Sequence, residues 1–260
     1  MLGRAGREKL NDMKTSSLHI TLGSLIIAAC FATGCATSKN ASCPTAVKCE
    51  AVAAASYQPP SKAVQAAITP AEALARLKAG NARFVAGEPL ARNLSAERAA
   101  TAAGQFPVAV VLSCLDSRTS SELIFDQGIG DIFNARVAGN VLNDDILGSM
   151  EFACKAAGAK LIAVIGHTKC GAVKGACAGV ELGSLTGLLA KIKPAEAAVP
   201  VPANPADYQH VDAVARANVK LVMAQIKERS PILAELLRDG KIALVGGMYD
   251  LESGQVTFLE

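Results

Sequence analysis

The sequence predicts an α/β domain in which helices flank a central, mostly parallel sheet. Short runs that are apolar apart from Lys160, typical of strands buried on both faces, occur at 108–112, 160–165 and 242–245. Segments with helical periodicity and helix-start residues separate these runs, which is the alternating order of α/β folds. A hydrophobic fraction of 51% over 260 residues supplies enough apolar material for one sizeable core.

The first predicted helix covers residues 70–85. Thr69 is a good N-cap, Pro70 suits the first helical position, and Glu72 stands three residues after the cap. Gly87 is expected to end this helix. The folded domain is therefore predicted to begin at residue 69 and to run to residue 260.

The later elements follow from the same patterns. In chain order we expect strands at 108–112 and 131–137, a helix from 144 or 145 to 157 that stops at Gly158, a strand at 160–165, a helix over 211–227, a second helix capped by Ser230-Pro231, and strands at 242–245 and 255–259. A turn at Ser253-Gly254 makes the last strand an antiparallel edge strand.

Residues 1–35 are predicted to be an export signal. Residues 18–33 contain no charged side chain and follow Lys14, which is the layout of the basic and apolar regions of a signal peptide. The apolar run is too short to span a membrane comfortably. A complete signal also starts at Met13, so the true start is either Met1 or Met13.

Two cysteines at the end of the apolar run resemble the lipidated cysteine of bacterial lipoproteins. Cys30 has the better aliphatic residue three positions before it, whereas Cys35 leaves a longer apolar region and a small, polar stretch behind it. Either is a candidate for lipidation, and the alternative is an ordinary secretory signal cleaved among the small residues. An exported, periplasmic protein anchored to the membrane is the expectation.

Residues 36–68 mix Ala, Ser, Pro and Lys without sustained apolar periodicity, and they are predicted to be a flexible tether. Cys43 and Cys49 lie in this segment. They either close a short local disulfide in an oxidising compartment or remain free thiols.

Composition excludes several classes of function. A net charge of +3 without a Lys/Arg block argues against nucleic-acid binding, and an aromatic fraction of 4% without Trp argues against a stacking platform. The segment 128–131 lacks the third glycine of a dinucleotide fingerprint, and neither a Walker A motif nor a G-x-S-x-G elbow is present. Nucleotide use and serine hydrolysis are therefore not indicated.

Reactive side chains follow two of the buried strands. Cys114, Asp116 and Arg118 come after the first, and His167 and Cys170 come after the third. Reactive groups of open α/β sheets gather beyond the carboxyl ends of the strands, so both clusters are expected to meet there. Two thiolates and one imidazole are a good ligand set for zinc, and three protein ligands leave one position open for water. The sequence therefore predicts one zinc ion per chain, in a site of catalytic type.

This pairing of clusters resembles the β-class carbonic anhydrases, and the resemblance covers residues 69–260. Supporting matches are EALARLKAGNARFV, ARVAGN, ANVKLVMAQIKERSPIL and LVGGMYDLESGQVTFL. The resemblance implies the fold of that family with an N-terminal helical arm, and the reversible hydration of carbon dioxide to bicarbonate and a proton. It also implies a homodimer or a larger even oligomer.

By that resemblance, Cys114, His167 and Cys170 are the zinc ligands, and Asp116 with Arg118 forms the catalytic dyad. Zinc lowers the pKa of bound water to about 7 and so provides hydroxide at neutral pH. Arg118 is expected to keep Asp116 ionised, so that the carboxylate accepts the hydroxide proton. In some family members this aspartate instead ligates zinc and closes the site, and that alternative stays open here.

The resemblance also implies part of a substrate pocket. Gln105 and Phe133 stand where plant-type enzymes carry a substrate-facing amide and ring, and Phe152 replaces their pocket tyrosine, so one hydroxyl donor is missing. The alternative for Gln105 and Phe133 is a solvated loop residue and a core ring. Gly171 is expected to start a helix whose free N–H groups polarise an oxygen near the metal.

Two other functions remain open at this stage. A zinc hydrolase of carbon disulfide or carbonyl sulfide resembles this family and uses the same hydroxide. A non-catalytic zinc-binding lipoprotein is favoured only if Asp116 or Cys177 fills the fourth metal position. His210 and Tyr208 are proton-shuttle candidates by their chemistry, and Cys154 is expected to be a core residue.

Overall fold

The computed structural model describes residues 57–200, 202, 204 and 207–259. The predicted export signal, the candidate lipidation sites Cys30 and Cys35, and the pair Cys43 and Cys49 lie outside these residues. Among the described helices, none combines the length and the apolar character that a membrane crossing needs.

A five-stranded sheet with the order β2-β1-β3-β4-β5 forms the centre of the domain. The strands are β1 (Ala109–Ser113), β2 (Ile132–Arg136), β3 (Leu161–His167), β4 (Ala243–Tyr249) and β5 (Val256–Leu259). The first four are parallel, and β5 pairs antiparallel with β4 at one edge. Every residue of β1 and β3 is buried, as their continuous apolar runs predict.

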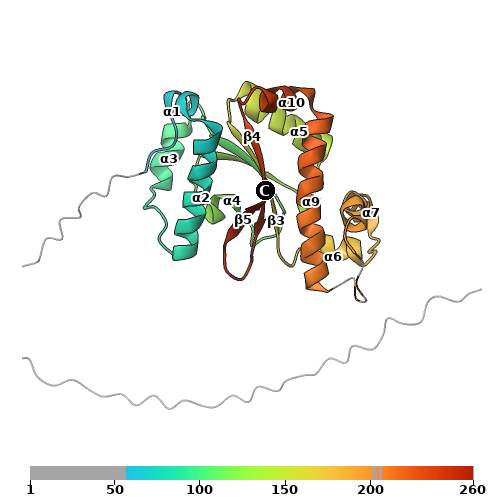
Figure 1. Ribbon diagram of the computed structural model, residues 1–260. Coiled ribbons are helices and arrows are strands. Elements are labelled where there is room, and N and C mark those ends of the chain that lie inside the picture. Colours follow the sequence, from blue (N-terminus) through green and yellow to red (C-terminus); the bar gives the residue numbers. More distant parts are fainter. Residues whose placement is uncertain (1–56, 201, 203, 205–206, 260) are drawn as a thin grey trace, which may run out of the picture. The chain divides into compact units, whose positions relative to one another are not determined.

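Helices cover both faces of this sheet, so the predicted α/β architecture is confirmed (Figure 1). They are α1 (Lys62–Ala67), α2 (Pro70–Ala86), α3 (Leu94–Thr101), α4 (Ser121–Ile124), α5 (Asp144–Glu151), α6 (Gly171–Cys177), α7 (Gly183–Leu189), α8 (Lys193–Ala197), α9 (Tyr208–Arg229) and α10 (Pro231–Arg238). A 3-10 turn η1 (Ala138–Asn140) and a π-helical turn η2 (Phe152–Ala156) complete the set. Helices α1 to α4 lie on one face, and α5, α6, α7, α9 and α10 on the other (Figure 1).

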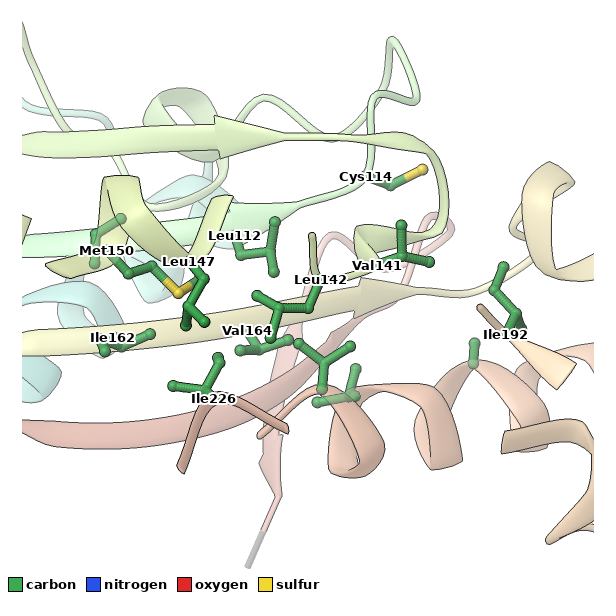
Figure 2. Packing of buried hydrophobic residues seen from close by; sticks show 14 of the residues in the cluster. Leu112, Cys114, Val141, Leu142, Leu147, Met150, Ile162, Val164, Ile192 and Ile226 are labelled. Carbon is green, nitrogen blue, oxygen red and sulfur yellow. The ribbon is translucent and has the colours of Figure 1, made fainter. Parts of the chain in front are cut away.

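The alternation of side chains along the strands divides the core into two halves. Leu112, Ile162 and Val164 face the larger cluster, in which Ile226 of α9 also packs, as Figure 2 shows. Cys114 belongs to this larger cluster, one residue beyond the end of β1. The intervening strand residues face the smaller cluster beneath α2. The metal-ligand candidate therefore sits at the end of a densely packed strand.

Helix α2 forms as its capping residues predict. The Thr69 side chain accepts the N–H of Glu72, the Glu72 carboxylate accepts the N–H of Thr69, and Gly87 ends the helix with φ +71°. The helix that was expected to form the N-terminal arm, beginning at Thr69, is α2. It buries Ala73 and Leu77 in the smaller cluster of its own chain.

The tether prediction for residues 36–68 is wrong at its carboxyl end. Ser61 caps α1, and the buried Gln65 donates from Nε2 to the carbonyl oxygens of Pro107 and Ala157 at 2.7 and 2.8 Å. One buried side-chain amide therefore holds this short helix on the domain. The helix forms although the segment lacks the apolar periodicity from which helices are predicted. The folded domain includes residues 57–68.

Other boundaries also differ from the prediction. The strand expected at 242–245 is β4, which continues to Tyr249, and the helix expected over 211–227 is α9, which begins at Tyr208 and ends at Arg229. The helix expected to reach residue 157 is α-helical only to Glu151, and the π-helical turn η2 follows it. The third strand continues to His167 rather than ending at residue 165, because it keeps its parallel pairing with β4 as far as Tyr249. His167 is thereby held by the sheet itself.

Candidate metal centre

The structure brings Cys114, His167 and Cys170 together from two chain segments. One ligand atom from each of the three side chains lies within 4.8 Å of the others, and all three residues are buried. The two sulfur atoms are 4.0 Å apart. Two thiolates on a tetrahedral zinc ion at 2.3 Å are separated by about 3.8 Å, so the observed spacing fits that geometry.

The imidazole of His167 is oriented for metal binding. Its Nδ1 lies 2.9 Å from the carbonyl oxygen of Thr168 and donates its proton there. Nε2 is then the nitrogen with the free lone pair, and in the described part of the chain this buried atom has no hydrogen-bond partner. A metal ion would satisfy it, and the backbone bond at the other nitrogen is the arrangement usual for metal-binding histidines.

The two thiols differ in their electrostatic environment. The pKa of Cys114 is lowered, first by a hydrogen bond from Cys170 and further by His167 and by the N–H groups of Asp116 and Gly139. The Gly139 N–H donates to Cys114 Sγ at 3.3 Å. The pKa of Cys170 is raised by its bond to Cys114 and by burial. The environment therefore favours a thiolate at Cys114 without a metal, and a bound cation would favour it at both positions.

Asp116 and Arg118 form the expected pair beside this cluster. The Asp116 carboxylate accepts from Arg118 Nε at 2.9 Å, from Nη2 at 2.8 Å and from the backbone N–H of Arg118 at 2.9 Å. These bonds from Arg118 hold the pKa of Asp116 well below its usual range, so the carboxylate is ionised at neutral pH. Neither Asp116 nor Cys177 joins the group of ligand atoms found in the described residues. A tetrahedral metal ion held by these three side chains would keep a fourth position open for water.

Sequence reasoning missed the residues that shape the loop after β1. Arg136 Nε donates to the Cys114 carbonyl oxygen at 2.9 Å, and its Nη2 donates to the carbonyl of Asp116. Thr119 Oγ1 also donates to the Cys114 carbonyl, at 3.0 Å. The register Ser113 to Arg136 places this guanidinium beside the loop, so pairing the two predicted strands in parallel would have identified it.

Three of the predicted pocket residues do not approach the metal cluster of their own chain. Gln105 is exposed in the loop before the amino end of β1. Phe133 pairs with Val110, four residues before Cys114, which is about 13 Å along the strand. Phe152 is exposed and contacts Phe133 edge to face, with ring centroids 6.2 Å apart. Within one chain these side chains gather away from the carboxyl ends of the strands.

The remaining predicted residues lie as follows. Gly171 is the first residue of α6, directly after Cys170. Tyr208 is exposed, whereas His210 is buried, so only Tyr208 has the solvent contact that a proton shuttle needs. Cys154 is a core residue, as expected, and burial raises its pKa to about 12.

Comparison with known proteins gives a consistent family. The family model for carbonic anhydrase matches residues 109–256. Carbonic anhydrase 2 of Mycobacterium tuberculosis is 40% identical over 188 residues, which cover 72% of this chain and 91% of the relative. The carbonic anhydrase of Mycolicibacterium smegmatis is 39% identical over 189 residues, which cover 72% of this chain and 92% of that relative.

Solved structures show a similar fold. A β-carbonic anhydrase of Aspergillus fumigatus aligns with a TM-score of 0.57 at 25% identity, covering 73% of this chain and 90% of that protein. Two β-carbonic anhydrases of Sordaria macrospora are described as tetrameric. The match to this pair has a TM-score of 0.55 at 23% identity, and it covers 61% of this chain and 83% of the matched chain.

Proposed function

Because the chain belongs to the β-class carbonic anhydrases, we propose that Cys114, His167 and Cys170 bind one zinc ion. The enzyme catalyses the reversible hydration of carbon dioxide to bicarbonate and a proton. The observation that carries the zinc assignment is the buried His167 Nε2, which lacks a partner among the described residues and belongs to the same ligand group as two buried sulfurs. Sulfur and imidazole nitrogen are preferred zinc ligands.

Zinc, when bound, supplies water with a pKa of about 7 and therefore hydroxide at neutral pH. The chain's own residues orient that reactant. With that reactant bound, Asp116 would accept a hydrogen bond from it and would direct its free lone pair toward carbon dioxide. Arg118 holds both carboxylate oxygens, which keeps Asp116 ionised and in a single orientation.

The alternatives are less well supported. The relatives named above are carbonic anhydrases, which favours carbon dioxide over carbon disulfide or carbonyl sulfide. A non-catalytic zinc protein requires a protein ligand in the fourth position, and neither Asp116 nor Cys177 takes it. The dyad also has the bidentate geometry that orienting a reactant requires.

An even oligomer completes the pocket in this proposal. Gln105, Phe133 and Phe152 lie away from the metal cluster of their own chain, so they can line a pocket only if a second copy supplies some of them. The exposed Phe152 ring supports such a contact. Light scattering should give a dimer or a multiple of it, and a fully active monomer would contradict the proposal.

Export and lipidation complete the proposed function. The uncharged segment 18–33 and the small residues before Cys30 and Cys35 support a periplasmic, membrane-anchored enzyme. Fractionating cells that express the full chain and a Cys30→Ala, Cys35→Ala double variant tests this. We expect the wild-type chain in the membrane fraction and the double variant in the soluble fraction. A wild-type chain found wholly in the soluble fraction would refute anchoring.

Stopped-flow measurement of carbon dioxide hydration, combined with metal analysis of the same sample, tests the catalytic proposal. We expect one zinc ion per chain and activity that disappears when a chelator removes the metal. Full activity in metal-free protein would refute the proposed role of zinc.

A further inference from the structure

Helix α9 packs unusually close to the strands that lead to the metal cluster. A Cβ atom at Gly166 would lie 2.8 Å from Val219 Cγ2, and one at Gly246 would lie 2.7 Å from Val219 Cγ1. Real Cβ atoms do not approach other atoms so closely. These two glycines therefore let Val219 of α9 settle on β3 and β4, beside His167 at the end of β3.

The neighbouring residue of α9 connects this helix to Cys114. Asn218 is fully buried, and its Nδ2 donates to the carbonyl oxygen of Gly139 at 2.8 Å. Gly139 has φ +65°, and its own N–H donates to Cys114 Sγ at 3.3 Å. A Cβ at Gly139 would lie 2.8 Å from the Ile192 side chain, so the turn has little freedom to shift. Asn218 thus holds Gly139, the residue whose N–H donates to the sulfur of a proposed metal ligand.

A second residue of α9 holds the turn between the other two ligands. Asp212 Oδ1 accepts the backbone N–H of Lys169 at 2.6 Å. Lys169 has φ +55°, a conformation that residues other than glycine adopt only infrequently. Since His167 and Cys170 flank this residue on either side, the bond from Asp212 stabilises the turn that spaces them.

We propose that α9 is the positioning helix of the metal centre, with Asn218 controlling the Cys114 side and Asp212 controlling the turn from His167 to Cys170. Each is a positioning residue, because it acts on a ligand through the backbone and touches no reacting atom. The inference rests on the proposed zinc site. Loss of such outer partners typically weakens metal affinity by about 10- to 100-fold.

The first test replaces Asn218 by leucine, which has the same number of side-chain heavy atoms and no donor. The matched control is Asn81→Leu. Asn81 is also buried on a helix and donates to the carbonyl oxygens of Ile124 and Gly254, but it lies in α2 on the opposite face of the sheet. Zinc affinity, measured by chelator competition, should fall about 10- to 100-fold in Asn218→Leu and stay within about twofold in the control.

A spectroscopic readout separates positioning from general loss of stability. Cobalt(II) in the site gives sulfur-to-metal charge-transfer bands that depend on the hydrogen bond to Cys114. Asn218→Leu should shift these bands, whereas Asn81→Leu should lower the melting temperature without shifting them. If Asn218→Leu does not fold, the smaller Asn218→Ser takes its place, and wild-type zinc affinity in either folded variant overturns the proposal.

The second test uses a conservative pair at Asp212. Asp212→Asn keeps an oxygen that accepts the Lys169 N–H, whereas Asp212→Leu removes it. The proposal expects near wild-type zinc affinity in the first and a loss of about tenfold or more in the second. Equal affinities in both variants would overturn the role assigned to Asp212.

The wild-type protein offers a test that needs no variant. After loading with ¹¹³Cd, the amide proton of Gly139 should show scalar coupling to the metal through Cys114 Sγ. Absence of that coupling in metal-loaded protein overturns this inference alone. Failure of the wild-type chain to bind zinc, cobalt or cadmium overturns the proposed metal site as well.

Discussion

Replacing Asp116 by asparagine isolates the contribution of the carboxylate that lies beside the metal cluster. Asparagine has nearly the same shape, but its amide nitrogen would face the Arg118 guanidinium where Asp116 now offers a second oxygen at 2.8 Å. The neutral amide is also a weaker hydrogen-bond acceptor than the carboxylate. Because Asp116 is not in the ligand group, zinc content should not change.

The magnitude follows from the role of this carboxylate. Removing one positioned hydrogen-bond partner of the reacting oxygen costs about 10²- to 10³-fold in rate. The three hydrogen bonds from Arg118 hold Asp116 in a single orientation, so we expect at least the lower figure, which corresponds to about 2.7 kcal/mol of transition-state stabilisation. Stopped-flow hydration with parallel zinc analysis provides the measurement.

Asp145→Asn is the matched control for this substitution. Asp145 is an exposed aspartate of α5, so its change removes one negative charge without touching the site. Turnover should stay at the wild-type level in this variant. If Asp116→Asn kept wild-type turnover with a full complement of zinc, the assignment of Asp116 to the reaction would be refuted. Asp116 would then have only a structural role.

Three further outcomes are expected. Cys170→Ser should lose both zinc and activity because a hydroxyl is a poor ligand beside a thiolate, and full zinc occupancy in this variant would contradict the ligand set. Folding lowers the pKa of Asp116 through Arg118 and the pKa of Asp250 through the backbone N–H of Ser253. Both carboxylates therefore contribute their full stability at pH values above their ordinary pKa of 3.8, and the contribution is lost as the pH falls below that value toward the lowered pKa. Urea unfolding should therefore show stability declining below about pH 4, and less steeply in Asp116→Asn; an equal decline in both proteins would rule out this role of Asp116. Phe152→Tyr restores a hydroxyl donor and should raise kcat/KM at unchanged zinc content, whereas an unchanged value would exclude this position from the pocket.

The grouping of Cys114, His167 and Cys170 was predictable because the chemistry and the topology agree. Buried parallel strands present their carboxyl ends at one edge of the sheet, and the sequence shows the strands before Cys114 and His167 as unbroken apolar runs. Cys170 follows His167 by three residues, so one tight turn is enough to bring it to the same place. The structure adds how the two loops bring the three ligand atoms within 4.8 Å of one another.

Other features depend on the long-range hydrogen bonds of one polar side chain, which leave no periodic pattern in the sequence. Gln65 holds α1 through two backbone carbonyls, so a polar stretch that looks like tether is folded. Asn218 occupies a helix position that would suit a hydrophobic side chain, and its partner Gly139 is 79 residues away. Neither contact follows from propensity or spacing, since the energy that determines it comes from satisfying a buried polar group.

The pocket residues show a different limit of prediction from the sequence of one chain. Resemblance places Gln105, Phe133 and Phe152 around the substrate, and the register of β1 and β2 places Phe133 about 13 Å along the strand from Cys114. Both statements hold together only if the pocket is shared between two copies of the chain. Catalytic competence then depends on assembly, because a monomer keeps its complete ligand set and dyad but lacks part of the surface that orients bicarbonate. Zinc binding should therefore survive dilution to the monomer, while turnover per chain falls.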